Sequence, residues 1–169
     1  MIDFSNFVLG ETSDHVDLDS SDDQRGAAIA LVRQARRSIH IFSRDLDKKI
    51  YDYLPFLEAV QETAVTHRGL IRILVKDSGK AVKYGHRLIQ LSQRLTSFIE
   101  IRKVAEDFKE YNEAYLVADE TGYVHRRHAD RFEGTVRFSA AKEAHELIVF
   151  FNEVWRTSAP DPDLQRIYL

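Results

Sequence analysis

Apolar residues recur along the first two thirds of the chain in two alternating spacings. In the first spacing they fall three or four positions apart, so that their side chains share one face of a helix. This spacing predicts helices over residues 21–37, 55–66 and 80–95. Between and after these helices lie short runs that are mostly apolar or alternate with polar residues, which is typical of strands. These predicted strands cover residues 38–42, 70–75 and 97–104. Strands separated by helices of this length favour parallel βαβ crossovers.

The pattern changes after residue 104. Residues 113–119 and 123–127 read as two strands of a hairpin, and Gly122 supplies the turn. A short strand over 134–138 and a long helix over 140–156 complete the chain. The predicted fold is therefore α/β, with a mixed, mostly parallel sheet flanked by helices.

The first residues are acidic and weakly patterned, so we divide the chain into an acidic segment, 1–22, and an α/β domain, 23–169. Ser21 and Gln24 have the spacing of a capping box at the start of the first helix. The start of the chain lacks the basic and apolar regions of a signal peptide, so a cytoplasmic location is expected.

Composition narrows the class of protein. The chain has 169 residues, of which 44% are hydrophobic and 30% charged, and this balance suits one globular domain. The net charge is −3, which argues against a global attraction to nucleic acid without excluding it. No cysteine is present, so disulfides and thiolate metal sites are excluded. No apolar run approaches the ~20 residues of a membrane-spanning helix.

Residues 25–157 resemble one half of a phospholipase D-like domain. The resemblance is carried, in order, by "AAIALVRQARRSIHIFS", "GLIRILVKD", "FIEIRKV" and "AHELIVFFNEVWRTS". The last of these contains Phe151 and Trp155, and domains of this family often end with such a pair. The resemblance implies a phospholipase D-like fold. It also implies that a single half pairs with itself or with another half.

The family's catalytic signature is His-x-Lys followed by an aspartate five residues after the lysine. Strand order places it at residues 112–119, where Asn112 and Ala114 stand for the histidine and the lysine, and only the aspartate is present, as Asp119. No histidine in the chain has a lysine two residues later, and the family's Gly-Ser-x-Asn segment is absent. An asparagine amide is not nucleophilic enough to replace imidazole. The same residues that imply the fold therefore argue against the family's reaction, and no catalytic residue is assigned.

In open α/β sheets, ligands collect beyond the carboxyl ends of the parallel strands. The residues after the first two strands, together with those at the motif position, are therefore candidates for an anion or ligand site: Arg44, Asp45, Lys76, Asp77, Asn112, Glu113 and Asp119. The alternative is ordinary loop chemistry, in which such side chains form turns, caps and an Arg–Asp pair.

A second polar cluster follows the hairpin. Its candidate anion or partner ligands are His125, Arg126, His128 and Arg131. Two histidines three residues apart could also hold a metal, but no motif with known ligand spacing is present, so neither a metal nor a cofactor is expected. The alternative is a solvated loop whose charges mostly cancel. On the predicted helix 80–95, Arg87 and Arg94 lie seven residues apart, either as a basic ridge or as a solvated face.

Three functional hypotheses follow. The first is a non-catalytic phospholipase D-like domain that binds a phosphate-containing or other anionic ligand, or a protein partner. The second is a phosphodiester-processing enzyme that uses His125, His128 or Glu113 as acid or base. The third is a nucleic-acid-binding accessory domain.

Overall fold

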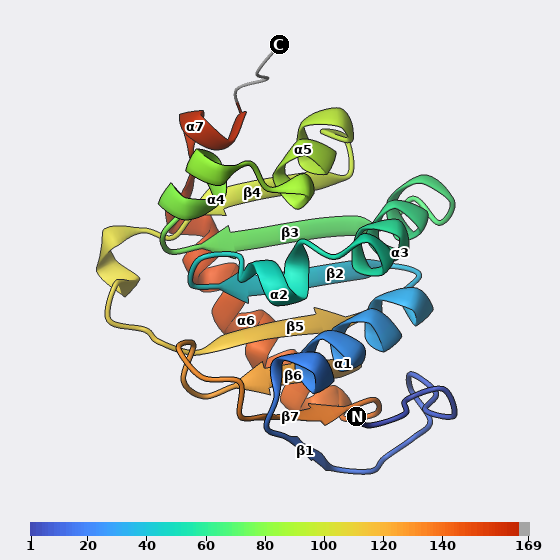
Figure 1. Ribbon diagram of the computed structural model, residues 1–169. Helices are drawn as coiled ribbons and strands as arrows, with labels where there is room; N and C mark the ends of the chain where they lie inside the picture. Colours follow the sequence, from blue (N-terminus) through green and yellow to red (C-terminus); the bar gives the residue numbers. More distant parts are fainter. Residues whose placement is uncertain (166–169) are drawn as a thin grey trace.

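A mixed sheet lies between two layers of helices in the computed structural model, which describes residues 1–165 (Figure 1). The last four residues of the predicted domain, 166–169, lie outside the described residues. The strands are β1 (Val16–Leu18), β2 (Ser38–Ser43), β3 (Leu70–Val75), β4 (Ile99–Lys103), β5 (Ala114–Ala118), β6 (Gly122–Arg126), β7 (Gly134–Arg137) and β8 (Ala159–Pro160). The helices are α1 (Ser21–Gln34), α2 (Lys48–Tyr51), α3 (Leu54–Val65), α4 (Gly79–Tyr84), α5 (Arg87–Arg94), the 3₁₀ turn η1 (Glu106–Phe108), α6 (Ala141–Thr157) and α7 (Pro162–Gln165).

The strands form one sheet in the order β1-β7-β6-β5-β2-β3-β4-β8. Among the described residues, only the β2–β3 and β3–β4 pairings are parallel, and the other five are antiparallel. The mixed α/β class and the flanking helices are confirmed, whereas a mostly parallel sheet is wrong. Strands β5, β6 and β7 account for three antiparallel pairings, which already outnumber the two parallel ones. The edge strands β1 and β8 add two more, and with three and two residues they are too short to show an alternating pattern.

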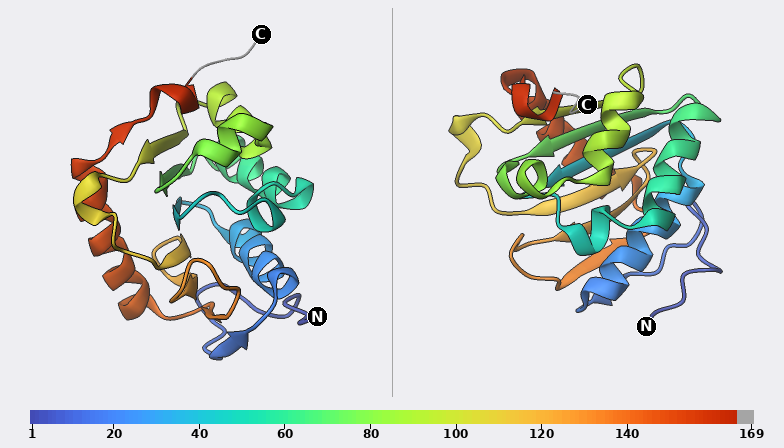
Figure 2. Two further views of the ribbon diagram at one scale, coloured as in Figure 1. Left: turned by 60° about the vertical axis from the view of Figure 1, so that its left-hand side comes forward. Right: turned by 45° about the horizontal axis from the view of Figure 1, so that its top comes forward.

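Helices cover both faces of the sheet. Helices α1 to α5 lie on one face and α6 crosses the other (Figure 2). The strands divide their apolar side chains between these layers. On β2, Ile39 and Ile41 join the core under α1 and α3, and Phe42 joins the core under α6 beside Phe151. The predicted alternation along this strand is therefore confirmed.

Helix α1 begins one residue earlier than the predicted capping box requires. The hydroxyl of Ser20 accepts a hydrogen bond from the amide of Asp23 at 3.1 Å, so Ser20 is the N-cap. The side chain of Gln24 instead donates to the carbonyl of Phe132 at 2.7 Å. The Ser21–Gln24 box is therefore wrong. The helix also ends at Gln34 rather than at residue 37, because the backbone of Ala35 is already extended.

The single helix predicted over 80–95 is two helices, α4 and α5. Gly85 separates them with φ +73°, a left-handed conformation that continues neither helix. His86 then caps α5, since its Nδ1 accepts from the amide of Leu88 at 3.1 Å. The break turns α5 so that it packs beside α3.

The acidic N-terminal segment contributes to the sheet. Residues 16–18 form β1 and pair with β7. Further towards the N-terminus, the ring of Phe4 is buried and lies 5.9 Å from that of Phe138. Within residues 1–165, no helix is long and apolar enough to cross a membrane.

Candidate functional site at the carboxyl edge of the sheet

The carboxyl ends of β2, β3 and β4 meet at one edge of the sheet, on the left of Figure 1. Strand β5 runs antiparallel to β2, and β6 antiparallel to β5, so the start of β5 and the end of β6 lie at the same edge. The left panel of Figure 2 turns this edge towards the reader. It gathers most of the predicted site residues, namely Arg44, Asp45, Lys76, Asp77, Asn112, Glu113, His125 and Arg126.

The loops that follow β2 and β3 are tied together through their backbones. The amide of Lys76 donates to the carbonyl of Ser43 at 3.1 Å, and the amide of Asp77 donates to that of Arg44 at 2.7 Å. These bonds continue the parallel ladder past the ends of both strands. They hold two cationic residues, Arg44 and Lys76, on neighbouring segments of the edge.

The two cations differ in how firmly they are held. The ammonium of Lys76 donates to the carbonyl of Tyr111 at 2.5 Å, which fixes it between the β3 loop and the approach to β5. An ammonium has three donors, so two remain for another partner. The guanidinium of Arg44 lies 3.6 Å from Asp45, and both side chains are partly exposed, so this pair is weak.

A carboxylate and an imidazole are in direct contact across the hairpin. Nε2 of His125 lies 2.6 Å from Oε1 of Glu113, and only 18% of the His125 side chain is exposed. The hydroxyl of Tyr111 also hydrogen-bonds to Glu113. Burial, reinforced by the charge of Glu113, raises the pKa of Tyr111 and of Tyr115, so both phenols stay protonated. The contact between Glu113 and His125 can fix the imidazole tautomer for acid–base catalysis, or the two side chains can hold a polar ligand.

Arg126 is buried and already engaged. Its Nε donates to the carbonyl of Arg131, and its Nη2 donates to that of Ala129, each at 2.6 Å. Its guanidinium lies 5.1 Å from the ring centre of Phe132 and 4.0 Å from a carboxylate oxygen of Asp47. This set of contacts shapes the loop after β6.

That loop carries the remaining candidates of the second cluster, His128 and Arg131, on the surface. It is pinned to the motif position, because the amide of Ala129 donates to the carbonyl of Asn112 at 2.8 Å. The side chain of Asn112 is exposed. The loop therefore lies next to the start of β5.

Asp119 lies at the opposite edge of the sheet, at the far end of β5. Its Oδ1 accepts hydrogen bonds from the amides of Arg36, Arg37 and Ser38, at 3.1, 2.7 and 3.0 Å. It therefore holds the connection from α1 into β2. The structure does not bring this aspartate together with the other candidates.

A cavity of about 300 Å³ opens beside the carboxyl edge, between α2 and α4. Its lining includes Asp45, Lys48, Lys80 and Tyr84. At its wall, His86 is buried, with Nε2 2.9 Å from the carbonyl of Leu46, and burial lowers the pKa of this histidine. Within residues 1–165, no group of three or more His, Asp or Glu side chains could hold a metal ion.

Comparison with known proteins identifies the chain at the level of its family. The profile of a domain of unknown function, DUF7931, matches residues 20–167. The chain belongs to this family. No curated protein sequence matches it.

Solved structures show which fold the DUF7931 domain has. The phospholipase D family member Nuc from Salmonella typhimurium aligns with a TM-score of 0.62 over 88% of this chain and 99% of its own, at 11% identity. Phosphatidylserine synthase from Haemophilus influenzae Rd KW20 aligns with a TM-score of 0.63 over 95% of this chain, at 13% identity. The archaeal chromatin protein TrmBL2 aligns with a TM-score of 0.64 over 87% of this chain, also at 13% identity.

The DUF7931 domain spans 53% of TrmBL2 and 42% of the synthase, but nearly all of Nuc. At these identities the comparisons show the fold alone. The phospholipase D-like fold implied by the sequence is confirmed.

Sequence reasoning missed the contact between Glu113 and His125 in this DUF7931 domain. The hairpin register contains a signal for it. Tyr115 pairs with His125, so Glu113 lies diagonally across from His125 on the same face of the sheet. The role of Tyr111, which contacts both Lys76 and Glu113, had no such signal, because it lies in an irregular segment before β5.

Proposed function

We propose that the chain is a phospholipase D-like domain that has lost the family's catalysis and binds a phosphate-type anion at the carboxyl edge of its sheet. The observation that carries this proposal is the pair of cations, Arg44 and Lys76, on two loops joined by backbone hydrogen bonds. Arginine and lysine are the residues that bind phosphate oxygens in proteins.

The absence of the family's nucleophile supports binding over catalysis. Asn112 and Ala114 occupy the motif position at the start of β5, and an amide and a methyl group can supply neither a nucleophile nor a cation. The carboxylate of Asp119, the aspartate of the motif, already accepts hydrogen bonds from three backbone amides, at the opposite ends of the strands from the candidate site. The nearby imidazole of His125 is engaged with Glu113.

The ammonium of Lys76 is suited to an anion because its position is set before binding. Its bond to the carbonyl of Tyr111 restrains a long side chain, so less rotamer entropy is lost when a ligand arrives. Arg44 has only a weak partner in Asp45, so an anion can compete for its guanidinium.

The test is a calorimetric titration with inorganic phosphate and with bis-p-nitrophenyl phosphate. We expect saturable binding that weakens at least tenfold in Lys76→Met and in Arg44→Ala. Lys142→Ala, which removes an exposed lysine at the start of α6, is the matched control and should bind as the wild type does. Equal binding by all four proteins, or none by any, would refute the proposal.

A second candidate function is favoured by the 2.6 Å contact between Glu113 and His125. A carboxylate-oriented imidazole is a common general base, so this edge could process a phosphodiester by another route. The assay is hydrolysis of bis-p-nitrophenyl phosphate with and without divalent metal. Turnover that is lost in His125→Ala and retained in the exposed-loop variant His128→Ala would establish this function in place of the first.

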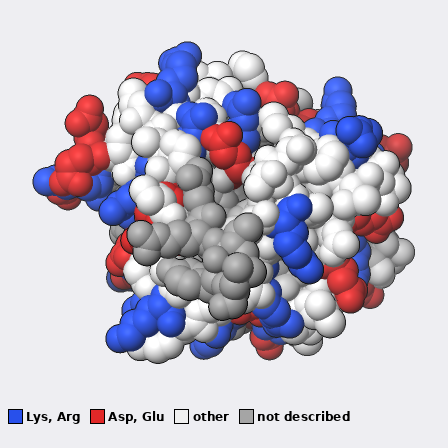
Figure 3. Space-filling model, turned by 90° about the horizontal axis from the view of Figure 1, so that it is seen from above, with Lys and Arg blue, Asp and Glu red and all other residues white. Residues whose placement is uncertain are grey.

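A third candidate, nucleic-acid binding, is favoured by one structural neighbour, TrmBL2, which is described as an archaeal chromatin protein with a novel mode of DNA binding. The net charge of −3 speaks against it. On the face seen in Figure 3, Lys and Arg side chains are interspersed with Asp and Glu. Retention on a DNA column that falls steeply with salt would support it.

Assembly and location follow as part of the same proposal. By its resemblance to the phospholipase D-like family, the chain pairs with itself or with another half. The location we expect is the cytoplasm. Sedimentation equilibrium would show a monomer if the self-pairing is absent.

A further inference from the structure

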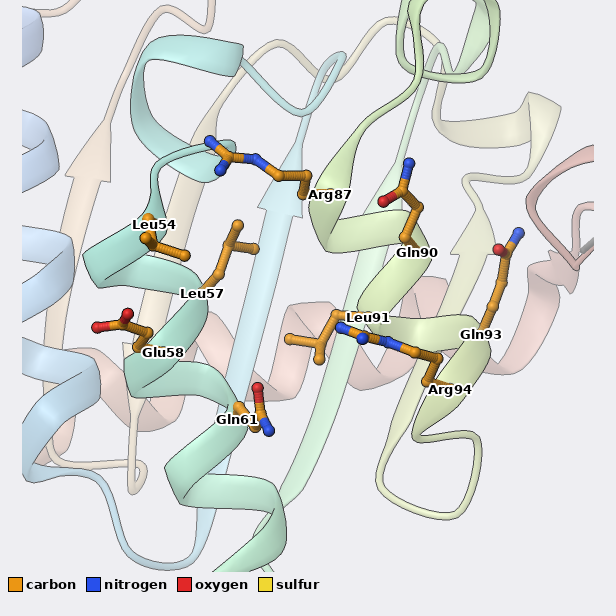
Figure 4. Close-up of a pocket in the computed structure, with 9 residues that line it drawn as sticks. All are labelled: Leu54, Leu57, Glu58, Gln61, Arg87, Gln90, Leu91, Gln93 and Arg94. Carbon is orange, nitrogen blue, oxygen red and sulfur yellow. The ribbon is translucent and has the colours of Figure 1, made fainter. Parts of the chain in front are cut away.

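A groove of about 370 Å³ runs between α3 and α5, on the face of the sheet that α1 to α5 cover and away from the carboxyl-edge residues (Figure 4). Its floor is apolar, where Leu57 and Leu91 are buried and face one another. Leu54, on the α3 side, is 53% exposed. Arg87 and Arg94 extend from α5 towards α3 in the same view. The two arginines that the sequence places on one helix face therefore line this groove together.

Arg87 is fixed in place before any partner binds. Its Nε donates to Oδ1 of Asp52 at 2.6 Å, and its Nη2 donates to the carbonyl of the same residue at 3.2 Å. The Asp52 side chain is only 7% exposed, so it anchors the guanidinium from below. The guanidinium still has a donor, Nη1, that makes no hydrogen bond within residues 1–165.

Arg94 differs from Arg87 because no carboxylate within residues 1–165 pairs with its guanidinium. Its side chain is exposed and forms no ion pair or hydrogen bond with the described part of the chain. It lies at the last residue of α5, and Arg87 lies at the first. Seven residues of helix place their Cα atoms about 10.5 Å apart along the axis. The groove thus has a cation near each end and leucines between them.

We propose that this groove binds an acidic amphipathic helix of a partner protein. An apolar side chain of that helix fits against Leu57 and Leu91, with Leu54 closing over it. Two carboxylates, two helical turns apart, reach Arg87 and Arg94. This is the helix-in-groove mode of recognition, with the charges setting orientation and the leucines excluding water.

The chemistry of the groove fits a peptide better than a nucleic acid. Its floor is leucine, and no aromatic side chain lines it on which a base could stack. On the α3 side, Gln61 points towards α5, whereas the carboxylate of Glu58 points away from it (Figure 4). The amides of Gln61 and Gln90 can bond to polar groups of a peptide. The proposal uses none of the residues assigned to the anion site.

The test is fluorescence anisotropy with a lactam-bridged helical peptide of about 14 residues, which carries leucines on one face and two glutamates seven residues apart. We expect wild-type protein to bind it and Arg94→Glu to bind at least tenfold more weakly. A second peptide has lysine in place of the glutamate that faces Arg94. It should bind the Arg94→Glu variant more tightly than it binds the wild-type protein, which would show that residue 94 contacts this peptide position directly. Arg156→Glu, the same charge change on an exposed residue of α6, should leave both affinities unchanged.

A further variant separates the apolar contact from the charges. Leu54→Lys replaces an exposed leucine, so the fold should persist while peptide affinity falls at least fivefold. No saturable binding of either peptide up to about 1 mM would overturn the proposal. So would an equal loss in Arg94→Glu and Arg156→Glu. Tighter, Arg94-dependent binding of a single-stranded DNA oligonucleotide would replace the peptide with nucleic acid.

Discussion

Oδ1 of Asp119 lies 2.7 Å from the amide nitrogen of Arg37, although 82 residues separate the two along the chain. The same carboxylate accepts from the amides of Arg36 and Ser38. The backbone of Asp119 is left-handed, with φ +53°, a conformation that aspartate and asparagine tolerate better than most residues. Asp119 therefore forms the turn between β5 and β6 together with Glu120, which has φ +54°, and its carboxylate also fixes the entry into β2.

Replacing this carboxylate should weaken the fold rather than ligand binding. Asp119→Ala leaves three amides without their acceptor, so we expect the free energy of unfolding to fall by about 2–4 kcal/mol. Asp119→Asn keeps one oxygen and tolerates the same φ, so its loss should be about 1 kcal/mol. Urea denaturation measures both. The control is Glu120→Ala, an exposed acid with φ +54° in the same turn. A Glu120→Ala loss as large as that of Asp119→Ala would contradict the assigned role.

The stability of the chain should depend on pH through His40. Burial beneath α6, with the charge of Arg72 as a smaller cause, lowers the pKa of His40 to about 4. The unfolded chain takes up this proton near the ordinary pKa of 6.5, whereas the folded chain does so only near 4. Stability should therefore be full above pH 6.5 and should fall as the pH decreases towards 4, by about 3 kcal/mol for this group.

The matched variant is His40→Phe, which keeps an aromatic ring against Phe151 and cannot take up a proton. Denaturant titrations at pH 7 and pH 4 should show a smaller loss of stability in the variant than in the wild type. Equal losses in the two proteins would show that other groups carry the pH dependence.

The loop after β6 should depend on one buried guanidinium. Arg126→Ala removes the donors to the carbonyls of Arg131 and Ala129, and we expect a loss of about 3 kcal/mol. The amide of Ala129 should also exchange its hydrogen faster, because the loop that presents it to Asn112 is released. Arg127→Ala changes the adjacent, exposed arginine and should alter neither quantity by much. Unchanged exchange at Ala129 in Arg126→Ala would disprove the assigned role.

Two glycines should respond to alanine in opposite directions. At Gly134 on β7, an added Cβ would lie 2.3 Å from the carbonyl oxygen of His125, so strands would have to separate and stability should fall by about 2 kcal/mol or more. At Gly26 in α1, the nearest atom is on the ring of Phe4 at 3.7 Å, which leaves room. Alanine there should raise stability by about 0.5–1 kcal/mol, because it favours the helix. Thermal unfolding of the two variants measures both signs, and a loss in Gly26→Ala would contradict the open space beside Phe4.

The sequence predicts well where one physical signal dominates. The three parallel strands and the hairpin follow from apolar runs, and the phospholipase D-like order of elements follows from them. The predicted turn at Gly122 is wrong, because Gly122 is the first residue of β6 and the turn is made by Asp119 and Glu120, both with positive φ. Prediction fails where the signal is short or lies in another part of the chain. The strand β8 has two residues, and the break between α4 and α5 depends on a single left-handed glycine.

Some residues of the candidate site could likewise be placed from the sequence, and others could not. Arg44 and Lys76 could be placed at one edge because loops after parallel strands share that edge. The position of Asp119 could not be foreseen from its motif, since its partners are amides that precede β2. The contact of Lys76 with Tyr111 depends on the path of an irregular segment that no periodicity describes.

The three residues of β1 also cover an edge of the sheet that could otherwise pair with another molecule. The family profile begins at residue 20, after this strand, yet Val16 to Leu18 occupy the hydrogen-bonding side of β7. A fragment that starts at residue 20 would leave β7 as an open edge, and open edges recruit strands from other chains. In the full chain β1 is the edge strand instead, and it is only three residues long with the charged and exposed Asp17 at its centre, which disfavours pairing with another chain.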